Sequence, residues 1–173
     1  MNIQTERLIR RPWRDSDHHP FVDMSEDPTV MEFMLPLKRE QALGAWIDDQ
    51  IAHMQEHGFC FWAAERKEDA AFVGTVGLRK IAYNVPFTPR LAYRASFGGH
   101  GYAPEAAAAC LQYGFDVLEL PEIMAITVPA NCKSRRVMEK LGMQHDPDDD
   151  FDHPRVPHRH PLRRHVLYRL FHE

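Results

Sequence analysis

Cysteine is scarce in this sequence, and the spacing of the few present excludes two common kinds of site. The 173 residues include three cysteines, Cys60, Cys110 and Cys132, an odd number without a Cys-x-x-Cys pair. A disulfide framework needs paired cysteines, and a cysteine zinc site needs ligands at short spacing. We therefore expect reduced thiols and a cytoplasmic protein.

Long apolar runs and an excess of positive charge are also lacking. The N-terminal residues have no apolar core of a signal peptide, and no run approaches the ~18 apolar residues that a membrane span requires. The formal net charge is −4, which argues against a generally basic surface for DNA. We expect neither a membrane nor a DNA partner, and the length predicts a single domain over residues 1–173.

Apolar residues recur with the periods of strands and helices in turn. Alternation and aromatic or β-branched residues predict strands over 8–13, 59–66, 71–78, 90–94, 123–128 and 165–170. Spacings of three and four predict a helix through 21–24 and helices over 39–57, 106–118 and 133–141. This order predicts the α/β class, a mixed sheet with helices on both faces. Gly74 and Gly77, inside a strand, indicate a bulge or a close backbone approach.

A glycine-rich turn precedes the third of these helices. Gly98, Gly99 and Gly101 fall within four residues, and Pro104 suits the first helical turn. The free N–H groups and the dipole of a helix start form an anion site, so we expect donors from Gly99 to Ala103 to bind phosphate. The alternative is a tight turn that only the chain geometry requires.

An apolar cluster earlier in the chain has two interpretations. Its members are Val30, Met31, Phe33, Met34 and Leu35. The cluster belongs to the core, or else it forms one wall of a substrate groove, to which adaptable methionine side chains are suited. It lies on a short, interrupted element, and both interpretations stay open.

Two segments that flank a near-continuous apolar strand carry a family resemblance. Gly99-His100-Gly101-Tyr102-Ala103 and Glu105-Ala106 precede the strand, and Asn131…Ser134…Leu141-Gly142-Met143 follow it. Together they resemble the GNAT superfamily of N-acetyltransferases, in the branch that includes the ribosomal-protein N-terminal acetyltransferases. Matching residues run from Thr5-Glu6-Arg7-Leu8 to Tyr168-Arg169-Leu170, so the resemblance covers nearly the whole chain. It implies the GNAT fold, with a V-shaped gap between the strand near Tyr93 and the strand that ends at Val128.

The resemblance implies acetyl-CoA as the cosubstrate. Its pantetheine arm would lie in the gap, where Asn131 would hold the arm or cap the helix that follows. Arg135 and Arg136 would contact the nucleotide phosphates or lie as solvated side chains. The residues implied to bind the pyrophosphate are Gly98, Gly99, His100, Gly101, Tyr102 and Ala103.

The resemblance also implies direct attack of an amine on the thioester. Ser134 matches a serine that serves as the acid in this branch, and is otherwise a helix-capping or coenzyme-contacting residue. Glu65 is the best-placed carboxylate for a base, and is otherwise an exposed or salt-bridged glutamate. Arg90 and Met138 stand where many relatives have an acidic residue and a tyrosine. They motivate a second hypothesis, an acyl-CoA-binding or sensing module without turnover.

The acceptor is expected to be a primary amine, either a protein N-terminus or a small molecule, and homo-oligomerisation stays open. The Asp- and His-rich stretch 146–165 has the residue types of a metal site, but its spacing fits no standard site, so no metal is expected. We expect this stretch to be a surface loop that covers the acceptor pocket.

Overall fold

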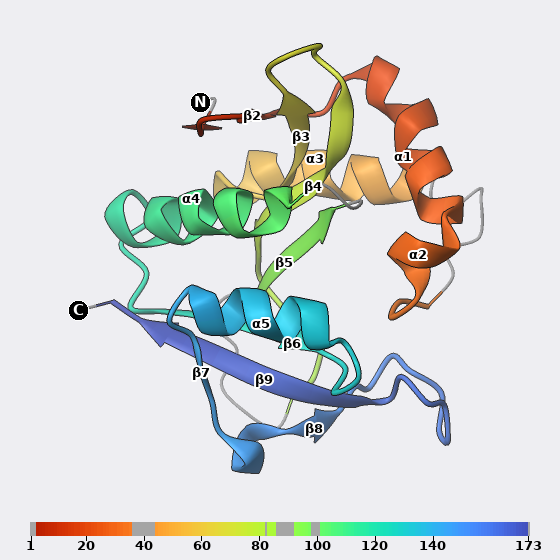
Figure 1. Cartoon of the computed structure of the whole chain (residues 1–173), viewed down its shortest axis with the longest axis vertical. Coiled ribbons are helices and arrows are strands. Elements are labelled where there is room, and N and C mark those ends of the chain that lie inside the picture. Colours follow the sequence, from red (N-terminus) through yellow and green to blue (C-terminus); the bar gives the residue numbers. More distant parts are fainter. Residues whose placement is uncertain (1–2, 36–43, 82, 86–91, 98–100, 173) are drawn as a thin grey trace.

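A mixed β-sheet runs through the centre of the molecule, and helices cover both of its faces (Figure 1). The computed structural model describes residues 3–35, 44–81, 83–85, 92–97 and 101–172. No helix within these ranges is long and apolar enough to cross a membrane.

The elements follow the predicted order. Strands β1, β7 and β8 have two residues each, too few for periodicity to reveal them. The helix expected over 39–57 is confirmed in its described part. The strands are β1 (Ile3–Gln4), β2 (Leu8–Arg11), β3 (Phe61–Arg66), β4 (Phe72–Arg79), β5 (Ala92–Phe97), β6 (Glu122–Thr127), β7 (Gln144–His145), β8 (Phe151–Asp152) and β9 (Arg164–Phe171). The helices are α1 (His18–Glu26), α2 (Pro28–Met31), α3 (Trp46–His57), α4 (Tyr102–Asp116) and α5 (Cys132–Lys140), with the 3-10 helices η1 (Asp15–Asp17) and η3 (Pro147–Asp149).

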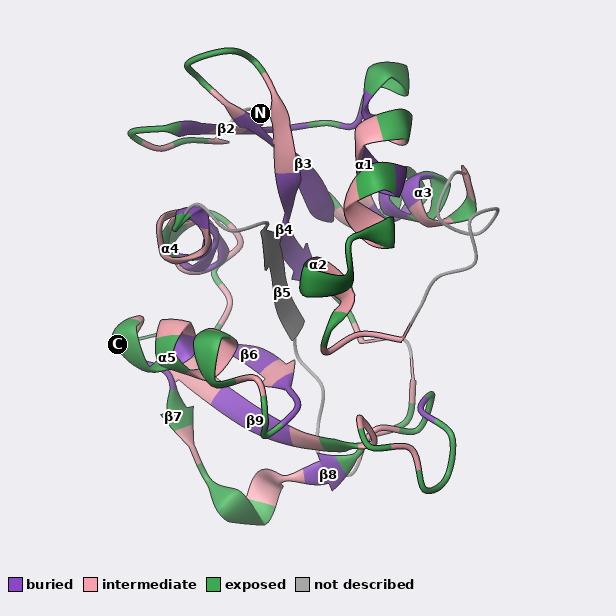
Figure 2. Ribbon diagram, turned by 45° about the vertical axis from the view of Figure 1, so that its right-hand side comes forward, coloured by how far each residue is buried: buried purple, intermediate pink, exposed green. Residues whose placement is uncertain are grey.

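Two parallel strands separate in the middle of the sheet. The strand order is β1-β2-β3-β4-β5-β6-β9-β7, with β8 also paired to β9. Among the strand pairs of the described residues, β5 and β6 run parallel and all the others run antiparallel. Their pairing joins Ala92 to Met124 and Tyr93 to Ala125. Beyond these pairs β5 stays paired with β4 and β6 with β9, so within the described chain their facing edges diverge (Figure 2). The expected fold class and the expected divergence of two central strands are confirmed.

Two apolar cores fix the helices to opposite faces of the sheet. α4 and α5 cover one face, where Ala107, Cys110 and Met138 are buried. α1 and α3 cover the other face, where the rings of Trp13 and Phe21 meet edge to face with centroids 5.4 Å apart. Burial of these side chains holds both pairs of helices in place against the strands.

Glycines stand where the backbone requires them. Gly58 ends α3 with a φ of +80°, a left-handed conformation that favours glycine. At Gly77 a Cβ atom would lie 2.0 Å from the carbonyl oxygen of Cys60. Gly74 lies opposite a register shift between Ala64 and Glu65. The expected bulge and close approach are therefore both present.

The apolar cluster at 30–35 joins neither core. None of its five apolar side chains is buried, and each is half-exposed. Val30 instead lines an open groove of about 300 Å³ between α1, α2 and the start of β4, together with Met24 and Phe72. Core packing is therefore wrong for this cluster, and its role as the wall of a substrate groove stays a prediction.

Candidate functional site

α4 and α5 bring two helix starts to the same edge of the sheet. β5 leads into α4 and β6 leads into α5, and because β5 and β6 are parallel neighbours, their carboxyl ends lie at one edge. Both helices lie on one face, with their first turns toward the same side (Figure 1). The positive ends of two helix dipoles therefore lie beside the separating strands.

Gly101 sets the direction in which α4 begins. This residue directly precedes the helix and adopts a φ of +69°. A Cβ atom here would meet nothing within 4 Å, so the backbone conformation rather than a lack of space favours glycine. Pro104, in the first turn, has no N–H, which leaves Tyr102 and Ala103 as helical donors there. Three other residues predicted to bind phosphate lie outside the described chain: Gly98, Gly99 and His100.

Asn131 caps α5. Its Oδ1 atom accepts a hydrogen bond from the backbone N–H of Ser134 at 3.1 Å. The expected capping role is confirmed, and the contact with a pantetheine arm stays a prediction. Ser134 is half-buried at this helix start, whereas Met138 is buried in the core. Ser134 is thus the hydroxyl residue that α5 holds next to the separating strands.

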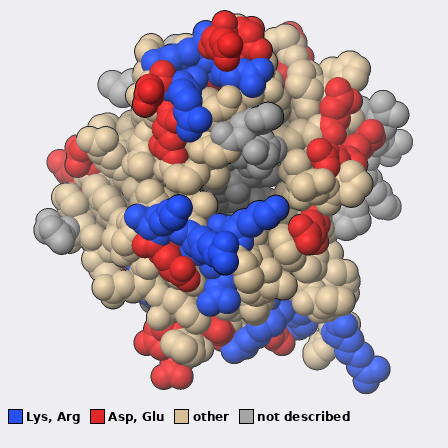
Figure 3. Space-filling view, in the orientation of Figure 1, with Lys and Arg blue, Asp and Glu red and all other residues tan. Residues whose placement is uncertain are grey.

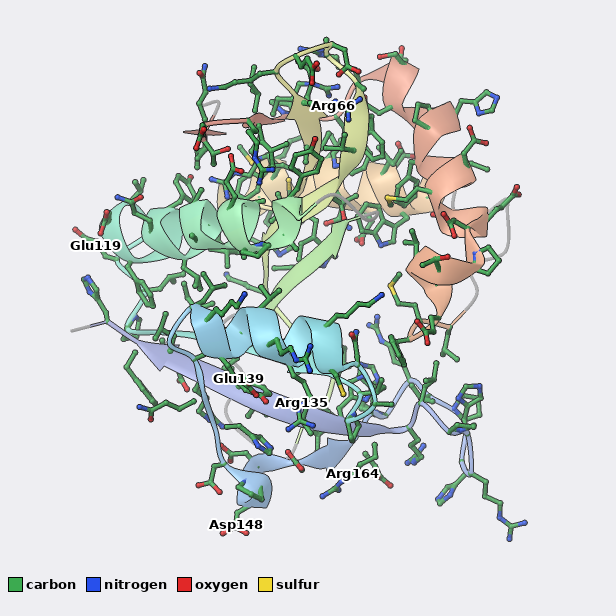
Figure 4. All side chains as sticks on the ribbon, viewed as in Figure 1. Arg66, Glu119, Arg135, Glu139, Asp148 and Arg164 are labelled. Atoms are coloured by element: carbon green, nitrogen blue, oxygen red, sulfur yellow. The ribbon has the colours of Figure 1, made fainter. Side chains whose placement is uncertain are left out.

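Arg135 fixes α5 to β9. Its Nε donates to the Tyr168 hydroxyl at 3.1 Å, and its Nη1 donates to the Pro129 carbonyl at 3.3 Å. The Tyr168 hydroxyl donates to Glu139 at 2.9 Å, and Figure 4 shows Arg135 and Glu139 over β9. Burial and the bond to Glu139 raise the pKa of Tyr168, although Arg135 opposes the shift. Tyr168 therefore keeps its proton, and Arg135 has a structural role in this network.

Arg136 belongs to a different environment. It is exposed on α5 together with Lys133 and Lys140. Figure 3 shows the basic side chains gathered over this helix, on the face that α4 and α5 share. Positive charge beside two helix starts favours a ligand with phosphate groups.

Glu65 lies in a buried ion-pair network that β2, β3 and η1 form together. Its Oε2 accepts from Arg11 Nε at 2.5 Å and from Arg14 Nη1 at 3.0 Å. Arg11 also donates to both carboxylate oxygens of Asp17, at 2.7 and 2.8 Å. Burial acts to raise the pKa of Asp17, but its bonds to Arg11 lower it below the ordinary value. Glu65 is salt-bridged, one of its two expected roles, and its action as a base stays a prediction.

The Asp- and His-rich stretch 146–165 pairs with β9 and with itself. Asp149 meets Arg169 at 2.7 Å, and Asp152 meets Arg163 at 3.2 Å. Within the described ranges, no three His, Cys, Asp or Glu side chains converge as metal ligands would. These ion pairs account for part of the charge in the stretch, and its place over an acceptor pocket stays a prediction.

Sequence reasoning missed a contact between the start of the chain and α4. Glu105 accepts hydrogen bonds from the backbone N–H and the Nε of Arg7, at 2.8 and 2.7 Å. Arg7 Nη2 also donates to the Gly101 carbonyl at 3.2 Å. Arg7 and Glu105 both stand in the motifs of the family resemblance. Because 98 residues separate them, no local pattern links the two.

Comparison with known proteins points to one family. A family model described as an acetyltransferase (GNAT) domain matches residues 7–144. YkkB, an uncharacterised protein of Bacillus subtilis (strain 168), is 31% identical over 146 residues, which are 83% of this chain and 85% of that protein. The crystal structure of a GNAT-family acetyltransferase from Bacillus anthracis aligns with 99% of this chain and 98% of its own, at 25% identity and a TM-score of 0.78. A ribosomal-protein-S5-alanine acetyltransferase from Vibrio fischeri shares the fold at 18% identity, with a TM-score of 0.74 and coverage of 99% and 96%.

Proposed function

Since this chain belongs to the GNAT acetyltransferase family, we propose that it transfers the acetyl group of acetyl-CoA to the α-amine of a protein N-terminus. Acetyl-CoA is the cosubstrate of this family, and the proposal concerns where it binds and which amine accepts. The choice of an α-amine rests on Glu65, the carboxylate expected to act as the base, which is paired with two guanidinium groups. An α-amine needs less help from a base than a lysine does. The structural similarity to an enzyme named for a ribosomal protein is consistent with a protein acceptor.

The donor lies along the edge where both helices begin. Its pyrophosphate binds N–H groups of residues 98–103, where the α4 dipole favours negative charge. Its pantetheine arm lies between β5 and β6, whose facing edges separate after Tyr93 and Ala125 and offer hydrogen-bonding groups to an added strand. Asn131 holds this arm through its amide, and Arg136 contacts the nucleotide phosphates from the basic surface of α5.

The reaction is a direct acyl transfer. The amine nitrogen attacks the thioester carbonyl carbon, the carbon–sulfur bond breaks, and the acetyl group remains on nitrogen as an amide. The nitrogen loses one proton and the departing sulfur gains one. Ser134 donates that proton and regains one from solvent, while a backbone N–H beside the carbonyl stabilises the developing oxyanion.

An α-amine suits a site with little base assistance. At pH 7 deprotonation takes roughly 1.4 kcal/mol for an α-amine with a pKa of about 8, against about 4.6 kcal/mol for a lysine with a pKa near 10.4. The Glu65 carboxylate is already bonded to Arg11 and Arg14, so the proposed reaction assigns no proton transfer to it. A chain of water molecules that carries the proton to solvent is sufficient to deprotonate an α-amine, for which the free energy is the smaller of the two.

The experiment measures release of free CoA thiol with three matched acceptors. One peptide has a free N-terminus and no lysine, the second has the same sequence with a blocked N-terminus and one lysine, and the third acceptor is a small diamine. We expect turnover with the first peptide and at least tenfold less with the others. A preference for the lysine peptide or the diamine overturns the acceptor, and acetyl-CoA binding without turnover on any amine overturns the enzyme proposal.

Two variants test the proposed acid. Ser134→Ala should lower kcat while the acetyl-CoA affinity changes little, because the Asn131 cap uses the backbone N–H of Ser134. Ser134→Thr keeps a hydroxyl group and should restore part of the rate. An unchanged kcat in Ser134→Ala removes Ser134 from the mechanism.

A further inference from the structure

Glu105 places a negative charge in the first turn of α4, next to the proposed pyrophosphate site. Each of its carboxylate oxygens is occupied by the start of the chain. Oε1 accepts from the Thr5 hydroxyl and from the Arg7 backbone N–H, and Oε2 accepts from Arg7 Nε at 2.7 Å. The Glu105 side chain is 19% exposed and that of Arg7 is 47% exposed. The carboxylate is therefore turned toward residues 5–7 and neutralised there.

Arg7 touches the helix start at two further points. Its Nη2 donates to the Gly101 carbonyl at 3.2 Å, and its guanidinium lies 4.8 Å from the centre of the Tyr102 ring. The Gly101 carbonyl and the Tyr102 N–H belong to one planar trans peptide group and point in opposite directions. A bond to that carbonyl consequently fixes the direction of the Tyr102 N–H, which is one of the donors in the first turn of α4.

The segment that carries Thr5 and Arg7 is itself firmly held. The Leu8 N–H donates to the Thr5 hydroxyl at 3.1 Å, and the Thr5 N–H donates to the Leu8 carbonyl at 2.9 Å. From the β3–β4 hairpin, the Lys67 N–H donates to the Arg7 carbonyl at 2.9 Å and Lys67 Nζ donates to the Thr5 carbonyl at 2.5 Å. Arg66, labelled in Figure 4, precedes Lys67 on this hairpin. The helix start is thus connected through residues 5–8 to the sheet.

We propose that Thr5 and Arg7 form a clamp on Glu105 and Gly101 that positions the α4 N–H groups for the pyrophosphate of acetyl-CoA. The inference rests on the proposed function. Arg7 acts as a positioning residue with two effects. It draws the Glu105 charge away from the site of the phosphates, and it fixes the peptide group whose N–H faces them. The hydrogen bonds from Thr5 and Arg7 also lower the pKa of Glu105, against the opposing effect of burial, so the carboxylate is charged when the clamp is formed.

The test compares a donor that has the pyrophosphate with one that lacks it. The variants are Arg7→Ala, Arg7→Lys, Glu105→Gln and the double variant of Arg7→Ala with Glu105→Gln. Calorimetry gives the Kd of acetyl-CoA, and thiol release gives kcat/KM with acetyl-CoA and with S-acetyl-pantetheine. We expect each single variant to weaken acetyl-CoA binding about five- to tenfold, as loss of a charge-assisted hydrogen bond would. We expect kcat/KM with S-acetyl-pantetheine to change less than twofold.

The sign of the Glu105→Gln effect separates the clamp from simple charge effects. If Arg7 merely attracts phosphate and Glu105 merely repels it, Glu105→Gln tightens acetyl-CoA binding and Arg7→Ala weakens it. The clamp requires both variants to weaken binding. The double variant should then bind no worse than Arg7→Ala, since the same contact is lost in both and the double variant also lacks the unpaired Glu105 charge. Arg7→Lys keeps the positive charge but lacks the planar fork of donors. Its Kd for acetyl-CoA should therefore be at most twofold lower than that of Arg7→Ala.

Asp49→Asn is the matched control. Asp49 pairs with Arg79 at 2.8 Å, a partly exposed ion pair between α3 and the last residue of β4, on the face of the sheet opposite to α4 (Figure 2). This variant should leave the Kd of acetyl-CoA unchanged. Equal acetyl-CoA binding by wild type and Arg7→Ala overturns the clamp and leaves the proposed function standing. A matching loss with S-acetyl-pantetheine also overturns it, because a general folding defect affects both donors. Failure of the wild type to bind acetyl-CoA overturns the proposed function itself.

Discussion

Asn131 is expected to serve two roles that substitutions can separate. Its Oδ1 atom accepts the Ser134 N–H at 3.1 Å and so caps α5. The proposed contact with the pantetheine arm uses the other end of the amide, the NH2 donor. Asn131→Ala removes both groups. Asn131→Asp keeps an acceptor for the cap and removes the donor.

The two variants should have different effects on stability. Loss of a helix cap destabilises a protein by about 1 kcal/mol, and in a chain of this size about 1 kcal/mol moves the Tm by roughly 2–4 °C. We therefore expect Asn131→Ala to unfold about 2–4 °C below wild type in the absence of ligand. Asn131→Asp should unfold at or slightly above the wild-type Tm, because a negative charge at a helix start gains about 0.3–1 kcal/mol from the dipole.

Both variants should bind acetyl-CoA less well. A net hydrogen bond contributes about 0.5–1.5 kcal/mol, so loss of the NH2 donor should raise the Kd by about twofold to tenfold. The assays are thermal unfolding followed by circular dichroism and calorimetric titration with acetyl-CoA. Asp27→Ala is the control, since Asp27 caps α2 by accepting the Thr29 N–H at 2.8 Å on another part of the molecule. It should lower the Tm without changing the Kd.

Two results would refute this reasoning. An equal loss of Tm in Asn131→Ala and Asn131→Asp would mean that the hydrogen bond to Ser134 does not stabilise α5. An unchanged Kd in Asn131→Asp would mean that the amide NH2 does not contact the donor substrate.

Three further predictions concern the scaffold. Gly77→Ala should destabilise the fold by about 1–3 kcal/mol in urea unfolding, because the new Cβ would lie 2.0 Å from a backbone carbonyl; a loss below about 0.5 kcal/mol contradicts this. Arg11→Met should lower the free energy of unfolding by about 3–5 kcal/mol, since it leaves the Asp17 carboxylate buried without its partner, and wild-type stability would refute the pairing. Burial lowers the pKa of His53 below the 6.5 of the unfolded chain, so on acidification the unfolded chain takes up a proton before the folded chain does. The free energy of unfolding should therefore fall as the pH is lowered from 6.5 toward the folded-state pKa, and His53→Gln should reduce this dependence on pH.

Local patterns were sufficient to predict the elements that carry the site. Apolar spacing over 39–57 predicted where α3 ends, and spacing over 133–141 predicted α5 to within one residue at each end. The ends of these helices carry local caps, Gly58 after α3 and Asn131 before α5, which is why a local pattern is enough to locate them. Gly77 predicted a close backbone approach for a local reason too. Glycine weakens the interior of a strand, so its presence there indicates that a side chain would not fit. The divergence of β5 and β6 followed from the family resemblance rather than from any residue pattern.

Long-range pairing of charges was not predictable in this way. The Asp17 carboxylate accepts the nearby backbone N–H of Arg14 at the start of η1, but it also pairs with the Arg11 side chain, which no local pattern indicated. Glu65 meets Arg11 across 54 residues, and Glu105 meets Arg7 across 98. The partner of a charged side chain depends on how strands and helices pack, and a single sequence carries no periodicity for it. The ion pairs of Glu65 and of the stretch 146–165 were therefore visible only in the structure.

The short pairing between β5 and β6 has a consequence for cooperativity. Within the described chain, two backbone pairs join β1–β5 and their helices to the unit of β6–β9 and α5. Longer ladders join the strands within each unit, so opening along this boundary would break few backbone hydrogen bonds, although it would also have to separate the apolar core that α4 shares with β6 and α5. A ligand between β5 and β6 bonds to both units and opposes that opening, by about 2.7 kcal/mol at a hundredfold excess over its Kd. In the proposed complex, acetyl-CoA would pair with β5 and β6 as an added strand does. Amide hydrogen exchange on both sides of the boundary should then slow together when acetyl-CoA binds.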